Sequence, residues 1–348
     1  MKTDSAQKPK QHHYVPQAYL RPFTSDDGTL ALYDLWSEGK LVRTNPRNVL
    51  KEKNLYTQPV HAERRFDTSY ETLFSKVEGH WPDLMAKIEK RVILSEEERS
   101  NLYEFVVLMR VRVTNTLKAV SRLLQEVVEE GVDELDEPLP QDILEQFRRV
   151  DPTLAPRPGR KNILTSDLVR AGLISVSVDP HRALAALPRL VLETLPIFGR
   201  PGLLAFVHNR TQVDFITSDN PCIYFHRSAK DVIVPFAAGP EGAFEFYFPL
   251  GPRLAVRFAT FARRHAEHRY EYSSGVVNEL NLLTAKFADR YLIARSEIDP
   301  AVVGAFPDVT CVPDLARSVA FRTGEVHSIG YRWGPPIRTL PKWDYGFL

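Results

Sequence analysis

Cysteine is scarce in this chain of 348 residues, which contains only Cys222 and Cys311 and no pair of cysteines in a CxxC spacing. So few thiols argue against a disulfide framework and indicate a reducing compartment. The segment Met1–Gln11 is polar and lacks the apolar stretch of a secretory signal. No apolar run approaches the roughly 18 residues that a membrane-spanning helix requires. We therefore expect a cytoplasmic protein with no membrane partner.

Several catalytic motifs are absent as well. No two glycines are separated by a single residue, so the dinucleotide-binding turn GxGxxG does not occur, and the GK[ST] of a phosphate-binding loop is missing. The nucleophile elbow GxSxG and the zinc motif HExxH are also missing. These absences disfavour kinases, ordinary dehydrogenases, elbow-type serine hydrolases and zinc proteases. No nucleotide cofactor is expected.

An excess of charge of one sign is lacking too. Lys and Arg total 45 against 44 acidic residues, for a net charge of +1. This balance disfavours a surface dedicated to nucleic acid but leaves room for a local basic groove. Charged residues make up 26% of the chain and hydrophobic residues 43%, which is ordinary for a globular protein with a sizeable core.

Hydrophobic periodicity predicts strands near the start of the chain and helices after them. Thr29–Trp36 and Lys40–Asn45 read as a β-hairpin. Apolar residues spaced by three or four predict a helix over Arg64–Arg91, which Pro82 kinks or splits. Ser95 with Glu98 forms a capping box that opens a long helix to Gly131.

Later segments switch between the two periods. Further helices are predicted over Pro140–Val150, Thr165–Leu173, Asp179–Pro196 and Val276–Ala294, and strands over Leu203–His208, Gln212–Thr217, Cys222–His226, Ala243–Phe248 and Arg253–Thr260. His265–Tyr272 is expected to be an exposed charged segment. Short loops between the late strands favour antiparallel pairing.

This order predicts an α+β fold, in which a mixed or mostly antiparallel sheet joins the N-terminal hairpin to the late strands and a helical middle region packs on it. We expect a disordered lead over residues 1–10 and one domain over residues 11–295, with the helical region at about 63–197. Residues 296–348 are expected to form an irregular tail that wraps the body.

The densest polar cluster is His12-His13, followed by Tyr14 and Pro16. One histidine can act as a base or metal ligand while the other donates a structural hydrogen bond. Adjacent residues of an extended segment point to opposite faces, so we do not expect both to bind one ion. The alternative is a polar arm or a pair of packing histidines.

Glu71 and Glu78 lie seven residues apart on a predicted helix and project to the same side. Carboxylates beside aromatic residues at the edge of a core can bind a cation, or they can be ordinary surface glutamates. Arg110 falls inside the apolar stripe of the next helix, so its guanidinium must be paired or face a polar cavity. Two roles stay open for Arg110, a structural pair with Glu71 or Glu78 and a clamp for an anionic substrate. Arg112 is less constrained and is a further candidate for substrate binding.

Two more polar groups occur late in the chain. The segment Thr217–Pro221 lies at the end of a predicted strand. It contains Ser218, Asp219 and Asn220, and this sequence is a strong turn signal. The functional alternative makes Asp219 a metal ligand or base, with Ser218 and Asn220 orienting it or the substrate. Asn278 and Asn281 lie three residues apart on a predicted helix, where asparagine is unfavourable, so this pair suggests a specific polar partner.

These motifs resemble a bacterial family known as domain of unknown function 4238. The resemblance begins at His12–Gln17 with Tyr19-Leu20-Arg21, continues through Lys51–Tyr56 and the helices of Glu71, Glu78 and Arg110, and resumes at Ile216–Pro221 and at Asn278 with Asn281. It covers about residues 11–295. It implies that His12, His13, Glu71, Asp219 and Asn220 act together, and it supplies no reaction.

Two functional hypotheses follow. The first is a metal-assisted hydrolase of phosphoesters or nucleic acid, with His12, His13 and Asp219 as catalytic residues and His12, Glu71, Glu78 and Asp219 as ligands of a divalent metal. Its substrate would contact Arg110, Arg112, Ser218, Asn220, Asn278 and Asn281. The second is a binding or sensor module, whose buried network is structural or recognises a small anion.

Overall fold

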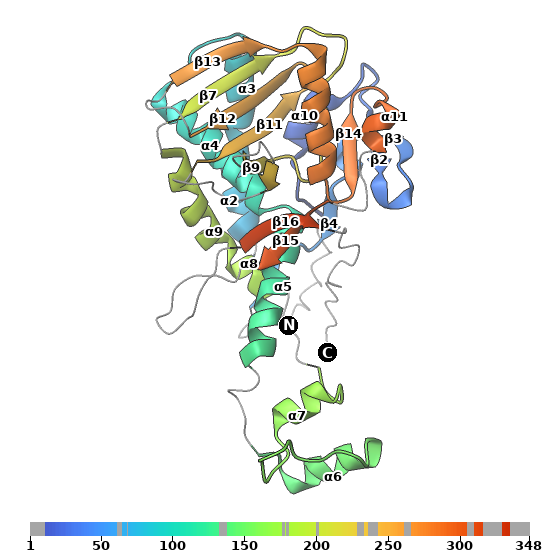
Figure 1. The fold of residues 1–348 in the computed structure, drawn as a ribbon. Coiled ribbons are helices and arrows are strands. Elements are labelled where there is room, and N and C mark those ends of the chain that lie inside the picture. Colours follow the sequence, from blue (N-terminus) through green and yellow to red (C-terminus); the bar gives the residue numbers. More distant parts are fainter. Residues whose placement is uncertain are drawn as a thin grey trace, which may run out of the picture. The chain divides into compact units, whose positions relative to one another are not determined.

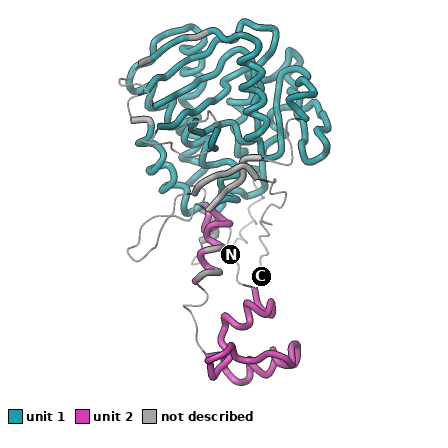
Figure 2. Tube along the Cα trace, in the orientation of Figure 1, with its two compact units in different colours: residues 1–119, 184–348 teal, residues 120–183 magenta. Residues whose placement is uncertain are grey.

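The structure is a computed structural model that describes residues 11–60, 65–67, 69–131, 138–175, 178, 181–199, 202–227, 233–235, 243–260, 266–304, 310–315 and 329–334. It has the predicted α+β fold, with antiparallel and mixed sheets and a helical middle region (Figure 1). The chain divides into two compact units, residues 1–119 with 184–348 and residues 120–183 (Figure 2). The second unit falls inside the predicted helical region.

The helices and strands, each numbered in chain order, have the following bounds. The helices are α1 (Gln17–Leu20), α2 (Ser69–Gly79), α3 (Trp81–Glu89), α4 (Glu96–Val111), α5 (Thr114–Gly131), α6 (Gln141–Val150), α7 (Thr165–Arg170), α8 (His181–Ala185), α9 (Leu187–Thr194), α10 (Ser274–Phe287) and α11 (Pro300–Val303). The strands are β1 (Gln11–His13), β2 (Leu30–Asp34), β3 (Lys40–Thr44), β4 (Lys51–Lys53), β5 (Gln58–Val60), β6 (Arg65–Asp67), β7 (Leu203–His208), β8 (Thr217–Ser218), β9 (Ile223–Arg227), β10 (Ile233–Pro235), β11 (Glu245–Gly251), β12 (Leu254–Ala259), β13 (Ala266–Glu271), β14 (Tyr291–Ala294), β15 (Thr310–Leu315) and β16 (Ile329–Gly334).

The largest sheet has the strand order β10-β9-β11-β12-β7-β13. Its strands pair antiparallel except β13, which runs parallel to β7. All seven residues of β11 are buried, and its alternate side chains enter different cores. Phe246 and Phe248 pack with residues of α3 and α4, whereas Tyr247 packs with residues of α10. Helices therefore cover both faces of this sheet (Figure 1).

A second sheet has the order β3-β2-β14-β8. It joins the N-terminal hairpin to β14 and β8. The hairpin and the late strands were predicted to share one sheet, but most of the late strands form the separate six-stranded sheet. The hairpin reverses at Glu38 and Gly39, with φ values of 56° and 71°. Glycine is required at the second of these positions, because a Cβ atom there would lie 2.6 Å from Cγ1 of Val303.

Two late predictions were wrong. The helix predicted to Ala294 ends at Phe287, and Tyr291–Ala294 forms β14. In the predicted strand Gln212–Thr217, only Thr217 is in a strand, because the amide of Ile216 bonds to a side chain of α10 instead of to a neighbouring strand. The segment expected to be exposed and charged contains β13, which pairs with β7, and its side chains at His268 and Glu271 are exposed as expected.

The middle helices depart from the predictions at two places. The predicted helix over Arg64–Arg91 begins only at Ser69, after the strand β6 at Arg65–Asp67, and it is split as predicted, with Pro82 in the first turn of α3. Ser95 and Glu98 form the predicted capping box of α4. The long helix that follows was predicted as continuous, but it breaks between α4 and α5 at Arg112.

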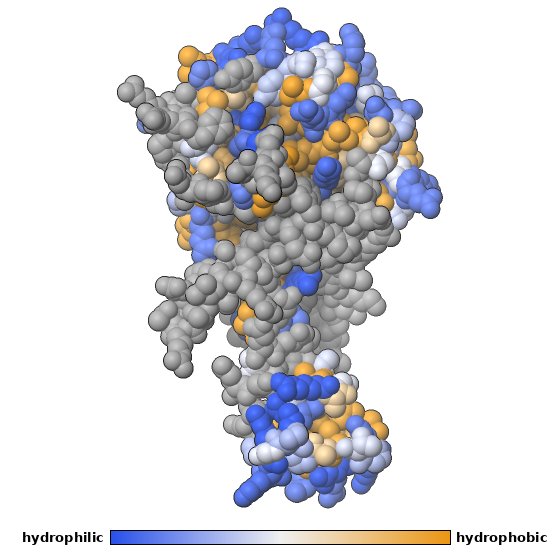
Figure 3. All heavy atoms as spheres, in the orientation of Figure 1, coloured by the Kyte–Doolittle hydropathy of each residue, from blue (hydrophilic) through white to orange (hydrophobic). Residues whose placement is uncertain are grey.

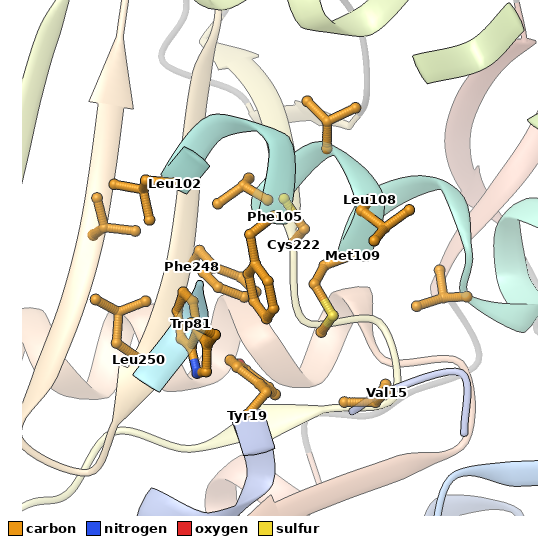
Figure 4. Close-up of a cluster of buried hydrophobic side chains, with 14 of the residues drawn as sticks. Val15, Tyr19, Trp81, Leu102, Phe105, Leu108, Met109, Cys222, Phe248 and Leu250 are labelled. Atoms are coloured by element: carbon orange, nitrogen blue, oxygen red, sulfur yellow. The ribbon is translucent and has the colours of Figure 1, made fainter. Parts of the chain in front are cut away.

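The opening motif packs into the core of the first unit, as predicted. Tyr19 stacks on Phe248 with ring centroids 4.9 Å apart, and its hydroxyl donates to the carbonyl of Pro249 at 2.7 Å. Trp81 stacks on Phe105 at 3.9 Å (Figure 4). These aromatic side chains are fully buried, so each contributes roughly 1.5–3 kcal/mol by leaving water.

The second unit has a core of its own, in which Leu144, Ile163 and Leu168 are buried. Hydrophobic side chains lie among charged ones on the face of both units drawn in Figure 3. In the described part of the chain, no helix is long and apolar enough to cross a membrane. The C-terminal segment contains the β15–β16 hairpin, and most of the predicted irregular tail lies outside the described residues.

Candidate functional site

A cleft of about 720 Å³ opens beside the N-terminal motif. Its walls come from β1, α1, α2 and the residue that follows α4. The lining residues are Gln11, His12, His13, Pro16, Gln17, Ala18, Arg21, Tyr56, Glu71, Thr72, Phe74, Ser75, Glu78 and Arg112. Five of the eleven candidate residues from the sequence therefore meet here: His12, His13, Glu71, Glu78 and Arg112.

His12 is the buried end of a dyad. Its Nδ1 atom accepts a hydrogen bond from the backbone N–H of Tyr56 at 2.9 Å, and its Nε2 atom lies 2.9 Å from Oε1 of Glu71. The imidazole also stacks on the Tyr56 ring, with centroids 5.7 Å apart. A neutral imidazole that accepts at Nδ1 carries its proton on Nε2, which places that N–H within ion-pair distance of the Glu71 carboxylate.

Glu71 is the member of the dyad that the cleft exposes. The side chain of Glu71 is 32% exposed, against 1% for His12. Both ring nitrogens of His12 are engaged, so proton transfer to a bound molecule would use the Glu71 carboxylate. We therefore assign His12 the role of positioning that carboxylate. A metal ion at Nε2 would require the other tautomer of the imidazole, with the proton on Nδ1. That Nδ1–H would face the N–H of Tyr56, which is unfavourable.

Arg112 forms the second half of the cleft. Its guanidinium donates to the Glu78 carboxylate and to the backbone carbonyl of His13. It also lies over the ring of Phe74 at 4.5 Å and that of Tyr56 at 5.6 Å. Burial lowers the pKa of Arg112, but Tyr56 and Glu78 together raise it above its ordinary value. The cation is thus held in place, and it ties α2 to β1.

His13 has a different environment from His12. Its Nε2 atom is buried and has no hydrogen-bond partner among the described residues. Burial lowers the pKa of His13, opposed by a hydrogen bond to the backbone of Arg47, and the positive charges of Lys51 and Arg112 lower it further. A neutral imidazole is therefore favoured at this edge of the cleft.

We expect His13 to make the protein less stable in acid. An unfolded histidine binds a proton near pH 6.5, whereas folded His13 resists protonation, so its contribution is complete above pH 6.5 and is lost as the pH falls below that value. His13→Gln should flatten the decline in the free energy of unfolding between pH 7 and pH 5, measured by urea denaturation. Substitution of the exposed His80 by glutamine is the control, and an equal flattening there would refute the assignment.

The two glutamates of α2 do not converge on one point. A separation of seven residues corresponds to about 10.5 Å along a helix axis, and Glu78 is already paired with Arg112. Among the described residues, no group of three or more His, Cys, Asp or Glu side chains is placed to hold a metal ion. A shared ion between Glu71 and Glu78 therefore has no geometric support.

Asp219 lies outside the cleft, contrary to the expectation that it acts together with His12. Its Oδ1 atom accepts from the backbone N–H of Asp289 at 2.9 Å, and its Oδ2 atom accepts from those of Arg290 at 2.8 Å and Tyr291 at 3.1 Å. Burial and the neighbouring Asp289 carboxylate raise the pKa of Asp219 to about 7, while the hydrogen bonds and Lys118 oppose the rise. Asp219 fastens the turn between α10 and β14.

Ser218 and Asn220 serve the same turn. The hydroxyl of Ser218 accepts from the backbone N–H of Asn220 at 3.2 Å, and the amide of Asn220 donates to the carbonyl of Phe287 at 2.8 Å. Both residues are fully buried. Neither lines the cleft, so their predicted part in substrate binding has no support from their positions.

The remaining candidates are also away from the cleft. Asn281 has the specific polar partner that its place in a helix suggested, since it accepts from the N–H of Ile216 at 3.1 Å and donates to the carbonyl of Asp214 at 2.8 Å. Asn278 is half-buried on α10. Arg110 donates to the hydroxyl of Thr116 at 2.7 Å and lies 6.0 Å from the Tyr224 ring. It is Arg112, two residues later, that pairs with the helix of the glutamates.

Two of the cleft residues that were not selected from the sequence have defined roles. Tyr56 joins both halves of the cleft, because its N–H bonds to His12 and its hydroxyl donates to the carbonyl of Arg112 at 2.8 Å. Arg21 contributes an exposed cation to the wall. Both residues belong to motifs that carried the family resemblance, which was the available signal.

Comparison with known proteins gives one match. A family model described as "Protein of unknown function (DUF4238)" matches residues 11–297, a range that contains every residue of the cleft. No curated protein matches the chain, and no solved structure does. The match confirms the resemblance seen in the opening motif and spans well over half of the 348 residues, so the chain belongs to the DUF4238 family.

Proposed function

We propose that the chain is a hydrolase of phosphoesters and that the reaction takes place in the His12–Glu71 cleft. The supporting observation is the dyad itself: a buried imidazole with both nitrogens engaged holds a partly exposed carboxylate at the wall of the cleft. A carboxylate positioned in this way beside an imidazole is suited to act as a general base.

The proposed mechanism uses four side chains of the cleft. Glu71 accepts a proton from water as the water oxygen bonds to phosphorus, and that proton passes to the leaving oxygen as its bond to phosphorus breaks. Arg21 offers its positive charge to the phosphoryl oxygens. His12 positions Glu71, and Arg112 holds α2 against β1 through Glu78 and His13.

The proposal keeps the divalent metal predicted from the sequence, and the assay tests whether activity depends on it. Glu71 is the carboxylate that a cleft metal would use, because Glu78 is paired with Arg112 and Asp219 lies elsewhere. Activity should therefore be measured with Mg²⁺, with Mn²⁺ and with EDTA.

We also keep the cytoplasmic location as part of the proposal, because the cysteine content is low.

The test is the substitution Glu71→Gln, assayed on bis(4-nitrophenyl) phosphate and on 4-nitrophenyl phosphate. Glutamine keeps the shape of the side chain and its acceptor oxygen but cannot take a proton. We expect kcat to fall by about 10²–10⁴-fold while the protein stays folded. The control is Glu89→Gln, an exposed position on α3. Equal turnover in the wild-type protein and Glu71→Gln would remove Glu71 from the mechanism.

One observation favours a second function, a binding module without turnover. The Arg112 guanidinium is bonded to Glu78 and to the carbonyl of His13 and lies against the rings of Phe74 and Tyr56, which is the pattern of a structural network. Such a cleft would bind a small anion through Arg21. Saturable binding of inorganic phosphate by calorimetry, with no hydrolysis of either ester by the wild-type protein, would support this alternative.

A further inference from the structure

Four cations border the cleft and form what we call the basic rim: Arg21, Arg47, Lys51 and Lys53. Arg21 is part of the cleft wall. Lys51 and Lys53 of β4 lie directly opposite His13 and Gln11 of β1, both of which line the cleft. Arg47, in the turn before β4, bonds to His13 through its backbone.

The charge of the basic rim is not neutralised. Within the described part of the chain, none of its four residues takes part in an ion pair, whereas Arg112, Lys118 and Arg290 each have an acidic partner. Glu52, between the two lysines, is half-buried and interacts with Arg290 and Lys118. In a chain of net charge +1, four unpaired cations at one cleft are a local concentration of positive charge.

We propose that the basic rim binds the sugar-phosphate backbone of a single-stranded nucleic acid, so that the substrate of the cleft is a polymeric phosphodiester. The claim that this polymer is the substrate rests on the proposed function, whereas the claim that the basic rim binds it does not. Lys51 and Lys53 are two residues apart on a strand, about 6.8 Å, so they can contact successive phosphates. The cleft that these cations border has Glu71 in its wall.

The test measures binding without turnover. Fluorescence anisotropy of labelled 20-nucleotide single-stranded RNA and DNA is recorded in EDTA with Glu71→Gln as the parent protein. The rim variant adds Arg21→Gln, Arg47→Gln, Lys51→Gln and Lys53→Gln. The control variant adds Lys90→Gln, Arg148→Gln, Arg149→Gln and Lys161→Gln at exposed positions, with the same change in net charge.

We expect the rim variant to bind at least 10-fold more weakly than the parent, and the control variant to bind within 2-fold of it. The slope of log K against log salt should become shallower by about 3 in the rim variant, since each phosphate contact to a single strand contributes about 0.7. Equal losses in both variants, or no binding by the parent, would overturn the proposal.

Two further outcomes separate the alternatives. Rim-dependent binding to vesicles of phosphatidylserine and phosphatidylcholine, without binding to the oligonucleotides, would identify a membrane surface and refute the nucleic-acid assignment. Rim-dependent oligonucleotide binding together with unchanged hydrolysis in Glu71→Gln would refute the proposed function and leave the basic rim as a nucleic-acid site.

Discussion

Replacement of Arg112 by alanine is expected to lower the free energy of unfolding by about 3–5 kcal/mol, the usual cost of removing one partner of a buried ion pair. The side chain of Arg112 is 4% exposed, and its guanidinium bonds to the Glu78 carboxylate and the His13 carbonyl. Both acceptors would lose their donor, and the rings of Phe74 and Tyr56 would lose the guanidinium that lies against them. Urea denaturation at pH 7.5 measures the loss.

Arg110→Ala is the matched control, because it removes the same type of side chain two residues earlier, in the last turn of α4. Arg110 is only half-buried and donates to the Thr116 hydroxyl, so we expect a loss of about 1–2 kcal/mol. The double-mutant cycle with Glu78→Gln should give a coupling energy for Arg112 and none for Arg110. A loss for Arg110→Ala that equals or exceeds that for Arg112→Ala would contradict the assignment.

This pair of arginines shows where periodicity stops being informative. The apolar stripe predicts one continuous helix after Ser95, and on such a helix Arg110 falls inside the stripe. In the structure the helix ends at Val111. The hydroxyl of Thr116 donates a hydrogen bond to the carbonyl of Arg110, and the hydroxyl of Tyr56 donates one to the carbonyl of Arg112. Tyr56 is more than fifty residues away in sequence, so no local pattern could have located the break or the burial of Arg112.

The cleft itself was more accessible to sequence reasoning. Too much apolar surface follows His13 for the opening motif to remain in water, so its packing could be predicted from composition. Glu71 and Glu78 share a helix face by spacing alone. What the spacing does not contain is the contact between His12 and Glu71, which requires β1 to pack beside α2. The tautomer of His12 depends in turn on the backbone of Tyr56.

Asp219 is a case in which the sequence motif is informative but its predicted functional role is not supported by its position. A Ser-Asp-Asn-Pro turn with a buried acid reads equally well as a metal ligand and as a turn former. The structure shows a third role, because Asp219 captures the three backbone N–H groups that follow α10. The same capture explains why the chain leaves the helix at Phe287 and enters β14, where continued periodicity predicted more helix.

Asp219→Asn is therefore expected to destabilise the protein by about 2–4 kcal/mol at pH 8, where the wild-type carboxyl, with its pKa of about 7, is ionised. Asparagine has one acceptor oxygen, so its NH₂ group would face at least one of the N–H donors of residues 289–291. Asp26→Asn at an exposed position is the control, expected within about 0.5 kcal/mol of wild type. The folded Asp219→Asn protein should retain wild-type kcat in the ester assay, because Asp219 does not reach the cleft. A variant of wild-type stability that loses turnover would restore Asp219 as a catalytic residue and refute its role as the anchor of β14.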